Sequence, residues 1–365
     1  MASLGLRFMS EIEPRLQVTE CTSPDEKTVA LDAFVLAMGF EDRAFHVLSK
    51  CKFNDTAKCI LIRYKNDVAG NRSVYEKYVN EIGLRFKPEN LIVVDLVSEN
   101  VDAFLHDLKI AISKLEAEVR HFGIDISGMT SYSICITMKC VRESRPFQKQ
   151  TVFYTSAKEY MPSHQEYEEL LTKLGVEKLG EEIDYLPKSM ALEMSDNLVL
   201  DAFAGHRSGD GKPCLALFAG YEVHRSSGTI DATNPSLLLL LYGDPGDAAL
   251  KWRLDLSKSL HAKFEKGRRC ASEVVSTLHI QESIDLLEKY YNYLIDDHDL
   301  IIAPICSKMH TLAAFLFWER YGEVQLTFPL PIGYNPEHKP VGVGASYYVE
   351  LYEPRMFFRN SSLPE

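Results

Sequence analysis

The chain has 365 residues, of which 46% are hydrophobic and 25% are charged, as in ordinary soluble globular proteins. At roughly 100–200 residues per domain, this length indicates two domains, each long enough to bury an apolar core. The formal net charge of −12 argues against the Lys/Arg stripe that extended nucleic-acid binding requires.

In the first half, short apolar runs alternate with stretches in which apolar residues recur every three or four positions. Strands are predicted at 29–38, 59–64, 91–95, 121–126 and 151–154, and helices at 73–83, 101–119 and 129–143. A connecting segment follows, with one predicted helix at 165–174 and a turn-rich stretch at 205–211.

The second half repeats this order. Strands are predicted at 212–219, 236–242, 273–278, 299–305 and 324–328, and helices at 247–263, 284–294 and 309–320. Short strands that are apolar along their whole length, alternating with helices, indicate a parallel sheet covered on both faces. The tail from 354 onward is expected to be peripheral.

Sequence landmarks recur in the two halves at a nearly constant distance. Gly-aromatic-Glu occurs at 39–41 and at 220–222, an offset of 181, and a Ser-x-Met turn occurs at 127–131 and at 307–311, an offset of 180. Two aromatic residues follow in each half at offsets of 175 and 174, namely Phe153 with Phe328 and Tyr160 with Tyr334.

We therefore predict an α/β fold made of two tandem Rossmann-like units, each with a mostly parallel five-stranded sheet covered by helices, arranged as a pseudo-dimer. The predicted units are 1–160 and 212–353. A connecting helical and loop segment at 161–211 joins them, and a tail at 354–365 follows.

The eight cysteines follow no disulfide or zinc-ligand spacing, and most of them lie in apolar runs. They are typical of buried thiols in a reducing compartment. The N-terminus shows no secretory signal, and the longest apolar run, 237–242, is too short to span a bilayer. We expect a cytoplasmic protein with no membrane segment and no metal centre.

Ligand sites in parallel sheets lie in the loops that follow the carboxyl ends of the strands. In the first half this rule selects Ser127, Gly128 and Thr130, which come just before a predicted helix. Their backbone N–H groups can hold a phosphate or a ribose oxygen, assisted by the helix dipole. The alternative is that Ser127 or Thr130 is an N-cap and nothing more.

The same position in the second half contains Ser307, Lys308, His310 and Thr311. A cation at a helix entrance opposes the macrodipole and costs up to about 1 kcal/mol unless an anion offsets it. These residues therefore form a candidate anion-binding turn. The alternative is that Lys308 points to solvent and His310 packs locally.

Gly39 and Gly220 follow the first strand of each unit, where the backbone often approaches a ligand closely. No G-x-G-x-x-G follows either glycine, so no nicotinamide or flavin cofactor is expected. The neighbouring Glu41 and Glu222 are candidate catalytic groups, or else they form structural ion pairs with nearby arginines. Two further acid–base candidates are Asp125 and His310.

The two helix-entry turns resemble those of the CARF family, the Rossmann-like sensor domains of CRISPR-linked ring nucleases and effectors. CARF domains often carry Asp or Asn followed by a Thr-Gly-Gly-Thr-Lys-x-Met-type turn, and the matching stretches are 125–130 and 305–311. The plan is also similar to SAVED domains, which fuse two CARF-like units, and to tandem α/β proteins of bacterial antiviral gene clusters. The second glycine of the family turn is absent from both copies, and the lysine is present only as Lys308.

This resemblance implies a nucleotide site across the two halves, and it leaves three hypotheses. The first is a nucleotide-sensing or adaptor subunit of a bacterial antiphage defence system. It would bind a nucleotide, a cyclic oligonucleotide or a partner protein from the same operon. The second is an enzyme on nucleotides or nucleosides, of phosphodiesterase, ring-nuclease or glycosidic-transfer type. The third is a ligand-free scaffold for a partner protein. We favour the first and lean toward binding without catalysis.

Overall fold

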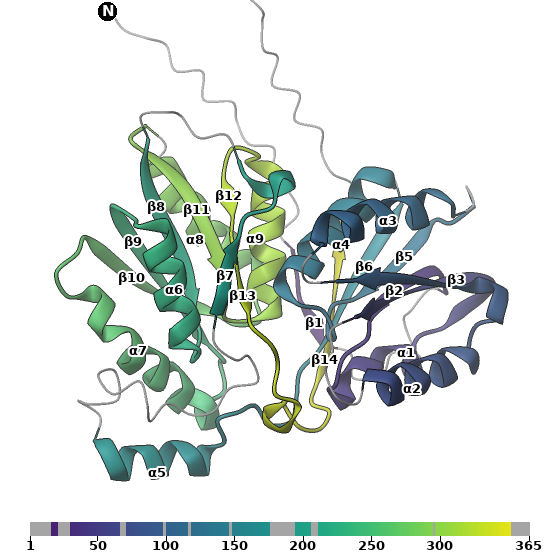
Figure 1. Cartoon of the computed structure of the whole chain (residues 1–365), viewed down its shortest axis with the longest axis horizontal. Coiled ribbons are helices and arrows are strands. Elements are labelled where there is room, and N and C mark those ends of the chain that lie inside the picture. The colour runs from purple at the N-terminus through teal and green to yellow at the C-terminus, as the bar shows by residue number, and fades with distance from the viewer. Residues whose placement is uncertain are drawn as a thin grey trace, which may run out of the picture.

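The computed structural model describes residues 16–20, 30–65, 71–97, 100–115, 118–145, 148–175, 194–205, 211–294 and 296–351. They form two lobes, each built on a sheet with helices on both faces (Figure 1). The predicted α/β fold of two Rossmann-like units is confirmed. Most of the predicted turn-rich stretch and the whole tail, at 206–210 and 354–365, lie outside the described residues.

The first lobe contains five parallel strands in the order β4-β3-β2-β5-β6. They are β2 (Leu31–Ala37), β3 (Phe53–Tyr64), β4 (Leu91–Leu96), β5 (His121–Asp125) and β6 (Lys149–Thr155). One face packs against α1 (His46–Lys50) and α2 (Asn71–Gly83), and the other against α3 (Val101–Ser113) and α4 (Ser131–Ser144).

The second lobe has the same topology, in the order β10-β9-β8-β11-β12. Its strands are β8 (Lys212–Ala219), β9 (Leu237–Asp244), β10 (Cys270–Ser276), β11 (His298–Pro304) and β12 (Gln325–Leu326). One face packs against α6 (Val223–Thr233) and α7 (Lys251–Glu265), and the other against α8 (Ile280–Leu294) and α9 (Lys308–Arg320). The identical strand order is what a duplicated unit requires.

The two units exchange strands. β14 (Ser346–Leu351) follows the second unit in the chain but pairs antiparallel with β6 of the first sheet. β7 (Met194–Leu198) follows the first unit but pairs antiparallel with β13 (Phe328–Pro331) of the second unit, and the two strands form a separate two-stranded sheet. With β1 (Thr19–Glu20) added outside β14, the first sheet has seven strands rather than the predicted five.

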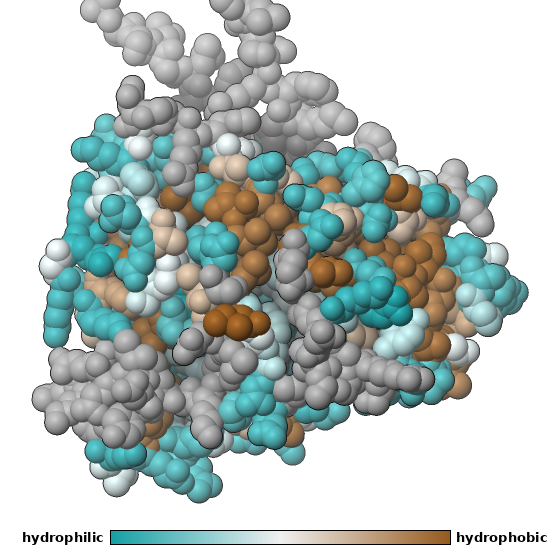
Figure 2. All heavy atoms as spheres, viewed as in Figure 1, coloured by the Kyte–Doolittle hydropathy of each residue, from teal (hydrophilic) through white to brown (hydrophobic). Residues whose placement is uncertain are grey.

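The core is continuous from one lobe to the other. A single apolar cluster extends from α3 and α4 to α8 and α9, and α4 and α9 pack against each other between the lobes. The Ser131 and Thr311 hydroxyl oxygens lie 3.2 Å apart, and these residues occupy equivalent positions at the 180-residue offset. Equivalent residues that touch each other mark a pseudo-twofold axis. Figure 2 shows apolar side chains at the surface near the boundary between the lobes, among hydrophilic ones.

Most predicted elements are present, with two informative differences. The helix predicted at 101–119 ends at Ser113, although Leu115 and Val119 remain buried in the same cluster. Helix α6 was not predicted, because Ser226 and Thr229 occupy half of its buried positions and conceal the helical spacing of apolar residues. The predicted connecting helix at 165–174 is α5 (His164–Leu174), which begins with a capping box.

The cysteines of the described residues all carry free thiols, and burial raises the pKa of several of them, including Cys59 and Cys135. None of the described helices combines the length and apolar character that a membrane crossing requires. Within the same residues, no group of three His, Cys, Asp or Glu side chains is placed to hold a metal ion.

Candidate functional site

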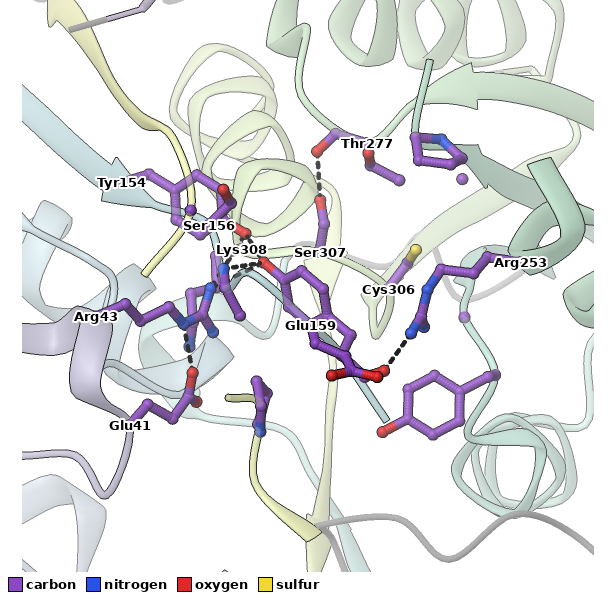
Figure 3. Close-up of a pocket in the computed structure, with 18 of the residues that line it drawn as sticks. Glu41, Arg43, Tyr154, Ser156, Glu159, Arg253, Thr277, Cys306, Ser307 and Lys308 are labelled. Carbon is purple, nitrogen blue, oxygen red and sulfur yellow. Dashed lines mark hydrogen bonds and ion pairs between the residues drawn. The ribbon is translucent and has the colours of Figure 1, made fainter. Parts of the chain in front are cut away.

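A cavity of about 960 Å³ lies between the lobes, where loops after the carboxyl ends of the strands of both sheets face each other. Figure 3 shows Glu41 and Arg43 on one side, Arg253 and Cys306 on the other, and Lys308 between them. Eight of the residues singled out in the sequence line this cavity, namely Gly39, Glu41, Gly128, Thr130, Gly220, Glu222, Ser307 and Lys308. The two predicted turns therefore open onto one space.

The first lobe contributes a buried ion pair between Glu41 and Arg43. The Arg43 guanidinium also donates to the Thr155 carbonyl oxygen at 3.0 Å and to the Tyr160 hydroxyl at 3.0 Å. Tyr154 completes this network, because its hydroxyl lies 2.8 Å from that of Tyr160.

The second lobe repeats the arrangement. Arg225 pairs with Glu222 at 2.6 Å and donates to the Pro329 carbonyl oxygen at 3.3 Å. Tyr334, the counterpart of Tyr160, lines the cavity beside Arg225 and has a raised pKa because of burial. The ion pairs considered from the sequence are thus present in both lobes, and each arginine is held beside the cavity.

The turn of the first lobe is closed by groups of the protein itself. Thr130 is the N-cap of α4, and its backbone N–H donates to the Tyr64 hydroxyl at 3.0 Å. Ser127 is fully buried, and its hydroxyl accepts from the Thr155 backbone N–H at 2.9 Å. A Cβ atom on Gly128 would lie 2.4 Å from the Ala37 carbonyl oxygen, so this glycine is required by packing. For Thr130, the alternative interpretation from the sequence is therefore correct, because this residue caps the helix.

The turn of the second lobe contains a lysine, Lys308, that has no counterpart in the first turn. Ser307 is the N-cap of α9, and Lys308 is its first residue. The Lys308 ammonium crosses to the first lobe and donates to the Met129 carbonyl oxygen. Desolvation lowers the pKa of Lys308 to about 8, against the opposing effect of the Glu41 charge. Among the described residues, no carboxylate lies within ion-pair distance of Lys308.

Three other predicted site residues lie behind the cavity wall. His310 is buried with its ring stacked on Phe218, and desolvation lowers its pKa to about 4. Thr311 is buried at the contact between the lobes. Asp125 is buried beneath the first turn, where burial raises its pKa to about 6 and its Oδ1 atom accepts from the Ser127 N–H at 2.9 Å.

The sequence did not single out several residues of the cavity wall. Arg253 on α7 donates to the Pro162 carbonyl oxygen at 2.8 Å and lies over the neighbouring Trp252 ring. Tyr64 is the last residue of β3. The rule that ligand sites follow strand ends would have selected Tyr64. Arg253 lies inside a helix and carries no comparable signal.

No protein-family model matches the chain, and no curated protein matches it. Among solved structures, a Type III CRISPR defence DNA nuclease activated by cyclic oligoadenylate is similar, with a TM-score of 0.47 and 11% sequence identity. The match covers 81% of this chain and 65% of that one. No functional conclusion follows from a likeness at this level.

Proposed function

We propose that this chain binds a nucleotide-type ligand in the cavity between its lobes and acts as a sensor or adaptor. The observation that carries the proposal is the placement of Lys308 and Arg253 in a cavity lined by both lobes, where each donates to backbone carbonyl oxygens rather than to a carboxylate. Arginine and lysine are the side chains that recognise phosphate groups.

The aromatic side chains of the cavity wall are suited to binding a nucleoside. Tyrosine and tryptophan rings line the cavity beside the cations, namely Tyr64, Tyr154, Tyr160, Tyr221, Trp252 and Tyr334. Nucleobases stack on such rings, and each stacked base contributes about 1–3 kcal/mol. The volume of about 960 Å³ is at the upper end of the range of small-molecule sites and exceeds the needs of a single nucleobase.

Binding is better supported than turnover. Glu41 and Glu222 are each engaged by an arginine. The other two acid–base candidates, Asp125 and His310, are buried outside the cavity wall. A general base must reach the proton that it removes, directly or through one water molecule. For these four candidates, the positions favour binding over catalysis.

The wider role that we propose is bacterial antiviral defence, with a protein partner encoded in the same operon. The support is the CARF-like sequence of the two turns, whose residues Gly128 and Lys308 line the cavity. Co-purification with the product of the adjacent gene, with and without nucleotide, tests this role. A partner that binds equally in both conditions would contradict a ligand-dependent adaptor.

The ligand site is tested by mass spectrometry of small molecules released from the purified protein and by calorimetry against mononucleotides, dinucleotides and cyclic oligonucleotides. Ala249 lines the cavity and Ala248 does not, and both are exposed in one short 3-10 helix. We expect Ala249→Trp to weaken binding at least tenfold, because the indole fills the cavity, and Ala248→Trp to bind as the native protein does. Failure of every nucleotide to bind, or unchanged binding by Ala249→Trp, would contradict the proposal.

A further inference from the structure

The chain runs from the first lobe to the second along the cavity. Strand β6 of the first sheet ends at Thr155, and helix α5 lies beside α7 of the second lobe (Figure 1). The segment between β6 and α5 forms part of the cavity wall, through residues 156–160 together with Ser163 and His164. The position of this wall therefore depends on how the segment is anchored at its two ends.

The end at the first lobe is anchored by buried groups. The Arg43 guanidinium donates to the Thr155 carbonyl oxygen and to the Tyr160 hydroxyl, each at 3.0 Å. Glu159 and Val341 exchange backbone hydrogen bonds of 3.0 and 2.9 Å. This end therefore stays in place as long as the first lobe is folded.

The end at the second lobe is more lightly attached. None of the described side chains of α5 is fully buried. Two neighbouring residues of α7 hold this end. The Trp252 ring stacks on Tyr167 with 4.9 Å between the ring centroids, and Arg253 Nη2 donates to the Pro162 carbonyl oxygen at 2.8 Å and to that of Tyr160. A helix with few buried side chains opens locally at a small fraction of the free energy of global unfolding.

The residues that hold α5 also face the ligand space. Trp252 and Arg253 line the cavity, as do Ser163 and His164 at the start of α5. The buried Nε atom of Arg253 has no hydrogen-bond partner within the described part of the chain, so this guanidinium keeps a donor while its Nη2 atom holds the segment. A ligand that fills this end of the cavity contacts both sides of the attachment of α5 to α7.

We infer that α5 is a ligand-coupled strap, whose docked position on α7 completes the cavity wall and is stabilised by a bound nucleotide. This inference rests on the proposed function and adds the element that responds to the ligand. A ligand that binds only the docked form shifts the docking equilibrium by the factor 1 + [L]/Kd, where [L] is the free ligand concentration. Docking of α5 is then the change through which a sensor reports its ligand to a partner.

Hydrogen exchange of the α5 backbone amides measures docking. An isolated helix of 11 residues is marginal in water, so undocking exposes these amides to exchange. The probe is the tightest-binding nucleotide of the calorimetry panel, at about 100 times its Kd. We expect it to slow exchange in α5 at least tenfold and to leave exchange in α3, which lies outside the cavity wall, within twofold.

Two failures of this experiment are distinguishable. A nucleotide that binds by calorimetry without slowing the exchange of α5 would overturn the inference and leave the proposed function intact. Failure of every nucleotide in the panel to bind would overturn both.

A substitution outside the cavity tests the attachment itself. Tyr167 packs against Trp252 but does not line the cavity. We expect Tyr167→Ala to speed the exchange of α5 at least fivefold in the ligand-free protein, with α3 unchanged because the variant remains folded. Nucleotide binding should weaken at least threefold, because part of the population is then undocked.

The matched control is Tyr293→Ala, which removes an exposed tyrosine of α8 outside the cavity wall and should leave both measurements unchanged. Equal exchange of α5 in the two variants, or binding by Tyr167→Ala as tight as that of the native protein, would overturn the inference.

Discussion

Replacing Lys308 by methionine should stabilise the ligand-free protein while it weakens phosphate binding. The ammonium is desolvated at the contact between the lobes, and its positive charge lies at the positive end of α9. Methionine has a similar length and no charge, and it forms helices well. The proposed binding site would therefore reduce stability at this position, as is common in binding sites.

The magnitude follows from the pKa of Lys308, which burial lowers from 10.5 to about 8. At about 1.4 kcal/mol per pKa unit, the charged form costs the folded state at most about 3 kcal/mol at pH 7. Loss of the hydrogen bond to the Met129 carbonyl oxygen lowers the expected stabilisation of the variant by about 1 kcal/mol. We expect the free energy of unfolding of Lys308→Met to exceed that of the native protein by about 2 kcal/mol at pH 7.

The stabilisation of Lys308→Met relative to the native protein should decrease as the pH rises. Because the pKa is lower in the folded state, the unfolded state binds more protons between pH 8 and 10.5, and native stability rises with pH across this window. From pH 7 to pH 9.5 the Lys308 contribution improves by about 2 kcal/mol, so the variant should lose most of its advantage.

Urea unfolding of the native protein, Lys308→Met and a control, Lys258→Met, at pH 7 and pH 9.5 measures both effects. Lys258 is exposed on α7 and lies outside the cavity wall. The comparison between proteins at one pH cancels the titration of every other group, and Lys258→Met should stay within about 0.5 kcal/mol of the native protein at both values. A Lys308→Met protein that is less stable at pH 7, or whose advantage is the same at both pH values, would refute the reasoning.

Three other substitutions test the packing around the cavity by urea or thermal unfolding. Gly128→Ala should lower the free energy of unfolding by about 1–3 kcal/mol, because the new Cβ would lie 2.4 Å from the Ala37 carbonyl oxygen. An unchanged unfolding midpoint would mean that the backbone of the turn moves to accommodate the new methyl group. Arg43→Met should cost roughly 3–5 kcal/mol by leaving Glu41 buried without its partner, and adding Glu41→Gln should recover part of the loss. Phe315→Ala should cost about 3–5 kcal/mol, since this ring is buried in the cluster that joins the lobes, and a smaller loss would show that the cluster refills the space.

The parallel strands were predictable because both of their faces are buried. Runs such as Leu237–Tyr242 are apolar at every position, and such runs in alternation with helices leave few other interpretations. The exchanged strands carry no equivalent signal. β7 and β14 are short and antiparallel, and β14 is fully buried only at Ser346, Val349 and Leu351. Their partners also lie in the other unit, which local sequence patterns do not encode.

The candidate site was predictable in outline for a different reason. The loops after parallel strands converge at one edge of a sheet, so topology alone places Gly220 beside Lys308, and the packing of the two lobes then adds Gly39 to the same cavity. This rule does not predict the direction in which a side chain points. His310 and Thr311 lie in the same turn as Lys308, but helix α9 directs both of them into buried packing.

The strand exchange makes the chain cross a second time between the lobes, from β13 to β14, beside the cavity. The ladder between β14 and β6 continues beyond the strands, where Glu159 and Val341 exchange backbone hydrogen bonds of 3.0 and 2.9 Å at the cavity rim. Opening the lobes requires breaking the apolar contact of α4 with α9, while the ladder between β14 and β6 stays within the first sheet. Two units held in this way share one cavity wall, so a change in one turn alters the site of both. The wall is nonetheless unequal at equivalent positions, because Tyr64 of β3 corresponds to Gly243 of β9, and Gly128 of the first turn corresponds to Lys308 of the second.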